Sequence, residues 1–85
     1  FELLQNVPNP WRDETVIPFR LAHPGLTRIS VTDVAGRVVY RHEEHFTAGL
    51  HEFAISNNDL PTIGIFYYTV ESSDWKATRK MVLAD

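Results

Sequence analysis

The run LPTIGIFYYTVE, residues 60–71, restricts the fold of this chain more than any other stretch. It is the densest run of β-branched and aromatic residues, with Pro61 and Gly64 at its front, so it predicts a β-strand. Alternate side chains of a strand point to opposite faces. One face carries Phe66, Tyr68 and Val70, which we assign to the core, and the other carries Ile65, Tyr67 and Thr69. Because both faces are largely apolar, we expect a central strand that is covered on both sides.

Turn-forming residues divide the rest of the chain into strands at a spacing of roughly ten residues. The expected strands are 1–6, 15–21, 26–34, 37–46, 50–56 and 76–83, in addition to the run above. Gly25 and Gly36 stand where the turns need a positive φ. No apolar pattern with a helical period is long enough for a helix. About seven short strands predict an all-β fold, an immunoglobulin-like antiparallel β-sandwich.

Apolar alternation assigns an inward face to most of these strands. The inward residues are Ile17, Phe19, Leu21, Ile29, Val31, Phe53 and Ile55, with His51 on the same face as the last two. Because Pro18 has no N–H to donate, we expect its strand at a sheet edge or with a bulge there. The last strand alternates Ala77, Arg79, Met81 and Leu83 with Thr78, Lys80 and Val82, and the pattern does not decide between these sets.

Two prolines make the segment Asn6–Trp11 a rigid, non-helical corner. Trp11 has two interpretations. It packs back against the edge of the sheet, as most tryptophans are buried, or it forms an exposed platform that stacks on a sugar.

Composition and charge limit the partners of the chain. Its 85 residues allow one domain, 1–85, with a single core. The net charge is −3 and the basic residues are scattered, which argues against nucleic acid. Absence of cysteine excludes disulfides and thiolate metal sites, and no apolar run is long enough to span a bilayer. Since the chain begins at Phe1, we interpret it as a piece excised from a longer polypeptide.

No arrangement of residues predicts catalysis, a metal site or a cofactor. There is no Ser-His-Asp grouping, no nucleophile elbow and no glycine-rich phosphate loop. His42 and His45 are an odd number of residues apart, so on a strand they point to opposite faces and cannot chelate together. Adjacent carboxylates such as Glu43 and Glu44 diverge for the same reason. We therefore expect a protein that is not an enzyme.

The ordered motifs of the chain resemble the type A C-terminal sorting domain of the type IX secretion system, a family of Bacteroidetes-type bacteria. These motifs are LQNVPNPW (4–11), TVI (15–17), DVAGRVVY (33–40), AGLH (48–51), LP (60–61) with GIFYY (64–68), and ATRKMVL (77–83). Each is common alone, but their order and spacing are fairly specific, and together they cover nearly the whole chain.

The resemblance implies a seven-stranded immunoglobulin-like sandwich that acts as a sorting signal at the end of a secreted parent protein. In that family the outer-membrane translocon recognises the domain, and a surface signal peptidase commonly removes it and can attach the cargo to anionic lipopolysaccharide. The implied location is secreted or cell-surface, by way of the periplasm and outer membrane. The matching positions are Pro8, Asn9, Pro10, Gly36, Arg37, Gly49, Gly64 and Lys80. We expect the last strand and the adjacent turn to be exposed to the secretion machinery.

Two features depart from the family pattern. Family members usually have one residue between the Leu-Pro pair and the following glycine, whereas Thr62 and Ile63 both intervene here, which suggests a bulge or a longer turn. Many members also end on a basic residue, and this chain ends at Asp85.

Two other functions compete with the sorting hypothesis. One is an accessory binding module of the carbohydrate-binding or fibronectin type, with Trp11, Tyr67 and Trp75 as an exposed, coplanar contact surface. The other is the immunoglobulin-like domain of flagellar hook-cap assembly proteins, which resembles the same N-terminal and turn motifs.

Overall fold

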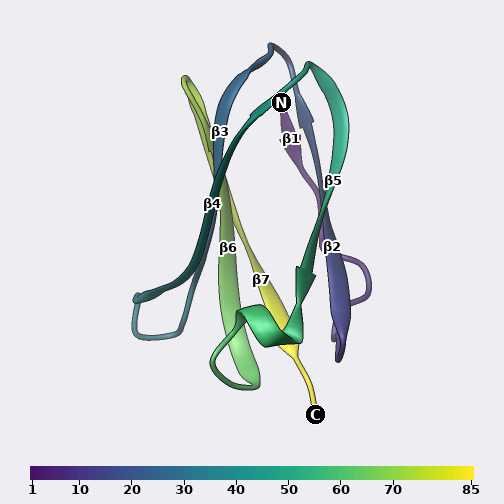
Figure 1. The fold of residues 1–85 in the computed structure, drawn as a ribbon, viewed down its shortest axis with the longest axis vertical. Helices are drawn as coiled ribbons and strands as arrows, with labels where there is room; N and C mark the ends of the chain where they lie inside the picture. The colour runs from purple at the N-terminus through teal and green to yellow at the C-terminus, as the bar shows by residue number, and fades with distance from the viewer.

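Two antiparallel sheets pack face to face in the computed structural model, which describes residues 1–85 (Figure 1). The strands are β1 (Glu2–Leu3), β2 (Glu14–Leu21), β3 (Gly25–Thr32), β4 (Val38–Phe46), β5 (Gly49–Ser56), β6 (Gly64–Ser72) and β7 (Trp75–Leu83). One sheet has the order β1-β2-β5, and the other has the order β4-β3-β6-β7. The predicted all-β sandwich of about seven strands is confirmed.

The connection between β5 and β6 contains the one helical element, the 3-10 turn η1 (Asn57–Asp59). Ser56 Oγ accepts a hydrogen bond from the Asn58 N–H at 3.2 Å, and the Asp59 carboxylate accepts one from the Ser56 N–H at 2.9 Å. This capping box satisfies backbone donors that the short turn leaves free. The chain has no helix that is long and apolar enough to cross a membrane.

The core consists of the inward faces of both sheets, and the predicted inward residues of β2, β3 and β6 lie in it. Fourteen buried hydrophobic residues form one cluster: Leu3, Trp11, Ile17, Phe19, Leu21, Ile29, Val31, Ile55, Leu60, Phe66, Tyr68, Val70, Met81 and Leu83. In β7, therefore, the set that contains Met81 and Leu83 faces inward. Arg79 belongs to this set, and its Nε donates to the Leu3 carbonyl of β1 at 2.8 Å.

The outer face of β6 is open to solvent, so the expectation that β6 is covered on both sides is wrong. β6 does lie inside its sheet, between β3 and β7. However, Ile65 is 41% exposed and Tyr67 is 38% exposed. The 85 residues form only two layers, which pack against each other, so there is no third layer to cover the outer face of the four-stranded sheet.

Pro18 lies in the middle strand of the three-stranded sheet, not at its edge. β1 pairs with β2 through Leu3 and Phe19, and the Leu4 N–H donates to the Pro18 carbonyl at 3.0 Å. Pairing resumes at Val7 and Val16, with one more residue between Leu3 and Val7 than between Val16 and Phe19. The expected bulge is therefore found not in the strand of Pro18 itself but in the segment that pairs with it, where the extra residue lies between Leu3 and Val7.

The backbone conformation at position 64 requires glycine. The turn that precedes Gly64 accounts for the departure from the family spacing. Gly64 has φ +132, and Gly36 has φ +84, as its turn predicted. Gly25, by contrast, does not have positive φ and begins β3 as an ordinary strand residue, which corrects the expectation for that turn. The pairing of β6 with β7 runs without interruption from Gly64–Leu83 onward, so the extra residue lengthens the turn and produces no bulge.

Replacing Gly64 with alanine should lower the free energy of unfolding by about 1–3 kcal/mol, because an L-residue is strained at this φ. A Cβ at Gly64 would meet no atom within 4 Å, so the effect isolates backbone strain from steric clash. Gly25→Ala is the matched control, since Gly25 also begins a strand, also has open space for a Cβ, and has no positive φ. Urea denaturation of both variants measures the difference. Equal stability of the two would contradict the assignment.

Candidate functional site

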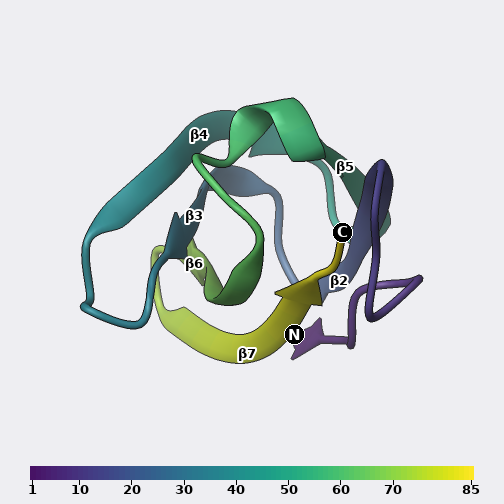
Figure 2. The same cartoon turned by 90° about the horizontal axis from the view of Figure 1, so that it is seen from below.

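The first and last segments of the sorting motifs meet in space. Residues Gln5–Trp11, here called the N-terminal strap, leave the three-stranded sheet and run beside the C-terminal half of β7 (Figure 2). Trp11 pairs with Leu83 in parallel orientation. The Val7–Pro8 and Asn9–Pro10 peptide bonds of the strap are both cis. Because the strap pairs with β2 at Val7 and with β7 at Trp11, the chain contributes its N-terminal segment to both sheets.

Four hydrogen bonds join the strap to the outer edge of β7 and the residues after it. They are Asn9 Oδ1 accepting from the Val82 N–H at 2.9 Å, the Trp11 N–H donating to the Val82 carbonyl at 3.0 Å, the Ala84 N–H donating to the Trp11 carbonyl at 2.7 Å, and Gln5 Nε2 donating to the Lys80 carbonyl at 2.9 Å. The free edge of the last strand is thus occupied from Lys80 to Ala84. The expectation of an exposed last strand holds for its outer face and not for this part of its edge.

Buried Asn6 anchors the strap from within. Its Nδ2 donates to Thr15 Oγ1 at 3.0 Å and to the Pro8 carbonyl at 3.1 Å, and Gln5 Nε2 donates to its Oδ1. Thr15 Oγ1 in turn donates to the Pro8 carbonyl at 2.9 Å. A buried amide is costly unless its donors and acceptors are paired, and here they are. The network fixes the path of the chain into Pro8.

The hydroxyl of Tyr68 connects the strap to the centre of the four-stranded sheet. It donates to the Leu4 carbonyl at 2.7 Å and accepts from the Asn6 N–H at 2.9 Å. Burial raises the pKa of this hydroxyl, and the hydrogen bond from Asn6 acts in the opposite direction. At neutral pH it stays protonated and keeps its role as donor. One side chain therefore satisfies two backbone groups outside the regular ladder.

The remaining motif positions are divided between the two ends of the sandwich. The turn between β3 and β4, which contains Gly36 and Arg37, lies toward the end where the chain terminates, as does Gly64, which pairs with Leu83; the turn between β4 and β5, which ends at Gly49, lies at the end where the chain begins (Figure 1). The Gly36–Arg37 turn depends on Asp33, whose carboxylate accepts from Ala35 N–H, Arg37 N–H and Arg37 Nε. These bonds, with the one from the Arg37 backbone as the strongest cause, lower the pKa of Asp33.

The three aromatic residues of the alternative binding surface do not share a face. Trp11 is 1% exposed and packs in the core, which confirms its packing interpretation and removes it from any platform. Tyr67 lies on the outer face of β6, whereas Trp75 pairs with Ser72 on the inward face and contacts Phe1. No coplanar, exposed surface links them.

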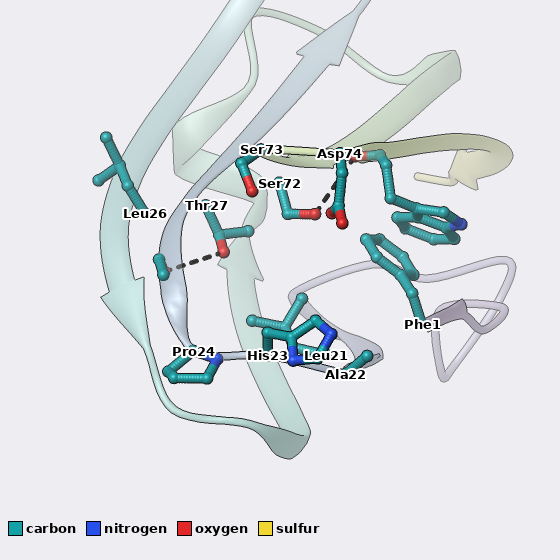
Figure 3. A pocket seen from close by; sticks show the side chains of 12 residues that line it. Phe1, Leu21, Ala22, His23, Pro24, Leu26, Thr27, Ser72, Ser73 and Asp74 are labelled. Atoms are coloured by element: carbon teal, nitrogen blue, oxygen red, sulfur yellow. Dashed lines mark hydrogen bonds between the residues drawn. The ribbon is translucent and has the colours of Figure 1, made fainter.

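A small pocket opens at the end of the sandwich that is opposite the C-terminus (Figure 3). Its lining combines apolar side chains such as Leu21 and Leu26 with the polar groups of Thr27, Ser73 and Asp74. Thr27 donates to the Gly25 carbonyl at 3.4 Å, so part of its polarity is used by the local turn. The pocket contains none of the predicted sorting positions.

The histidines of β4 and β5 form local hydrogen bonds and ring contacts where the edges of the two sheets meet. His42 Nε2 lies 2.8 Å from the Glu44 carboxylate, and its ring packs 4.8 Å from that of Phe53. His51 Nε2 lies 2.7 Å from the Thr47 carbonyl, as expected for a hydrogen-bonded residue at the sheet rim. No group of three His, Cys, Asp or Glu side chains is placed to hold a metal ion.

Sequence reasoning missed Asn6, Thr15 and Asp33. Asn6 and Thr15 are polar residues at core positions, and no alternation pattern identifies such residues. The role of Asp33 could have been predicted from the sequence, because an aspartate three residues before a turn glycine commonly accepts hydrogen bonds from the backbone of the turn. Tyr68 was predicted as core, but its hydroxyl was given no role.

The family model described as "Secretion system C-terminal sorting domain" matches residues 7–84 of the chain. The match begins inside the N-terminal strap and ends at Ala84, whose N–H is bonded to Trp11. No curated protein matches the sequence.

Replacing Tyr68 with phenylalanine should cost about 1–3 kcal/mol for each backbone group that it leaves buried without a partner. Those groups are the Leu4 carbonyl and the Asn6 N–H. Tyr67→Phe removes the same atom from the adjacent residue, whose hydroxyl faces outward, and should leave stability nearly unchanged. Urea denaturation compares the two variants. A loss that is equal in both would show that the Tyr68 hydroxyl is not a structural bridge.

Stability should fall at alkaline pH, because burial raises the pKa of Tyr68 and also that of Tyr40, where the Asp59 carboxylate adds to the effect. A raised tyrosine pKa means that the folded state retains the proton longer than the unfolded state. The contribution is complete below the unfolded pKa of about 10 and is lost as pH rises through the folded value. Unfolding free energies measured across this range should decline, and the decline should be shallower in Tyr68→Phe. An identical slope in the variant would contradict the pKa assignment.

Proposed function

Since this chain belongs to the family of secretion system C-terminal sorting domains, we propose that it directs a parent protein through the outer membrane by the type IX machinery. The parent cargo domain would precede Phe1. Export by this route leads to the cell surface or to secretion. The partners that we propose are the outer-membrane translocon and the surface signal peptidase.

The family match over residues 7–84 carries the sorting proposal, and the contact between the strap and β7 indicates the form in which the signal would be recognised. Asn9 and Val82 are 73 positions apart in sequence, yet they are joined by a hydrogen bond of 2.9 Å. Asn9 therefore lies beside Val82 only when the domain is folded, and Gln5 of the same strap is bonded to the Lys80 carbonyl. We infer that the machinery recognises a folded surface and not a linear tail.

The proposed role includes no catalytic step, in keeping with a family of sorting signals. Among the sorting positions, Arg37 forms a salt bridge within its own turn, with its Nε 2.9 Å from the Asp33 carboxylate. Gly36, Gly49 and Gly64 supply positive φ. Within the proposal these four positions shape the domain, and the strap and Lys80 present its surface.

The binding-module alternative lacks the surface that it needs, because Trp11 is buried and Tyr67 and Trp75 lie on opposite faces of the sheet. The hook-cap alternative has no observation that favours it over sorting.

Fusion of residues 1–85 to the C-terminus of a reporter that carries a periplasmic signal peptide should place the reporter outside a cell that has a type IX system. Reporter activity in the periplasmic, surface and culture-medium fractions measures the outcome. The controls are the reporter without the domain and the same fusion in a strain that lacks the translocon, and both should stay in the periplasm. Periplasmic retention of the intact, folded fusion in the competent strain would overturn the proposal.

A further inference from the structure

The outer face of the four-stranded sheet has two halves of different character. Cross-strand register places its outward residues in rows: Glu43–Arg28–Glu71–Lys76, then Arg41–Ser30–Thr69–Thr78, then Val38–Thr32–Tyr67–Lys80, and finally Ile65–Val82. The first row is polar and the last is apolar. We call Arg41 of the second row, together with Val38, Tyr67 and Lys80 of the third and Ile65 and Val82 of the last, the outer strip.

In the upper row the charges compensate one another. Arg28 lies 3.3 Å from Glu43 and 3.7 Å from Glu71, and Glu71 is directly opposite Lys76. The row below it is closed by a hydrogen bond of 2.8 Å between the hydroxyls of Thr69 and Thr78. The charged groups and hydroxyls of these side chains are therefore paired with one another on the surface of the sheet.

The cations of the outer strip have no such compensation. Arg41 lies opposite Ser30 and Lys80 lies opposite Tyr67, and neither cation forms a salt bridge within the chain. They stand on β4 and β7, the two edge strands of the sheet, and in neighbouring rows, so their Cα atoms are separated by three strand spacings and two residues along the strands, or about 16 Å. This pair of free positive charges contrasts with the net charge of −3 of the chain.

Tyr67 lies between the two cations, and the other exposed apolar side chains of the outer strip lie beside Arg41 on β4 or in the last row, next to Tyr67 and Lys80. Val38, Ile65 and Tyr67 are among the exposed large hydrophobic residues, and Val82 is half-buried opposite Ile65. Tyrosine and arginine are among the residue types that contribute most to binding at protein interfaces, and an apolar centre with a polar rim is the usual arrangement.

We propose that the outer strip docks onto a partner protein whose contact surface is apolar around the position of Tyr67 and carries a carboxylate toward each edge of the sheet. This inference rests on the proposed function, because the partner would be a component of the secretion machinery. The complementary carboxylates would pair with Arg41 and Lys80, and Tyr67 would supply the central contact.

Charge distinguishes this partner from two other occupants. A second copy that packed the strip against itself about a two-fold axis would bring cations against cations, which is unfavourable. Each basic residue near an anionic membrane contributes about 1 kcal/mol to the binding free energy, so two free cations would give only weak binding.

The test uses the reporter fusion in the competent strain. Tyr67→Ser and the double variant Arg41→Glu/Lys80→Glu should each lower export at least tenfold, and Lys80→Arg should retain it. Leu50→Ser and Arg20→Glu are the matched controls, because these residues are exposed in the three-stranded sheet, directly opposite each other. Both controls should export as the unchanged domain does. Urea denaturation of each purified fusion should show that the strip variants unfold at the same midpoint as the unchanged domain.

The outcomes separate the two proposals. If the unchanged fusion stays in the periplasm, the sorting function fails. If that fusion is exported and the folded strip variants are exported equally well, the strip inference is overturned while the sorting function stands.

Two further measurements address the occupant. The purified domain should sediment as a monomer and should not float with phosphatidylglycerol vesicles. A dimer that Tyr67→Ser dissociates, or flotation that Arg41→Glu/Lys80→Glu abolishes, would replace the proposed protein partner with a second copy or a lipid surface.

Discussion

The missing N–H of Pro18 is the constraint on which the N-terminal half of the architecture depends. The Leu4 carbonyl lies opposite this proline and would accept its N–H in a regular ladder, since the Leu4 N–H already donates to the Pro18 carbonyl. Tyr68 from the other sheet supplies the donor instead. Regular pairing of β1 therefore ends, the extra residue is accommodated, and the strap is free to cross from one sheet to the other.

The crossing solves the problem of an unpaired sheet edge. β7 ends the four-stranded sheet, and an open edge with free N–H and C=O groups invites pairing with other chains. The strap covers the part of that edge near the C-terminus with backbone and side-chain hydrogen bonds, and Arg79 reaches across to Leu3 farther along. Where the strap covers the edge of β7, the outer face of the strand stays accessible, and it includes Lys80.

Local patterns predicted the fold well, because burial in a two-layer sandwich follows the alternation of side chains. Ile17, Ile29 and Phe66 faced inward as their strands required, and the family match agreed with the order of the motifs. Alternation could not assign β7, since Arg79 shares a face with Met81. It also could not predict the contact of Asn9 with Val82 or the bridge made by Tyr68, because those hydrogen bonds join segments more than sixty positions apart.

The parallel course of the strap and β7 has a mechanical consequence. Phe1 and Asp85 lie toward opposite ends of the sandwich (Figure 1), and the strap runs in the same direction as the strand that it covers. A pulling force applied between the two termini would slide the strap along β7, so its hydrogen bonds would bear the load together in shear and would not open one after another. In the proposed sorting role, in which a cargo precedes Phe1, this shear geometry would resist tension at the junction with that cargo.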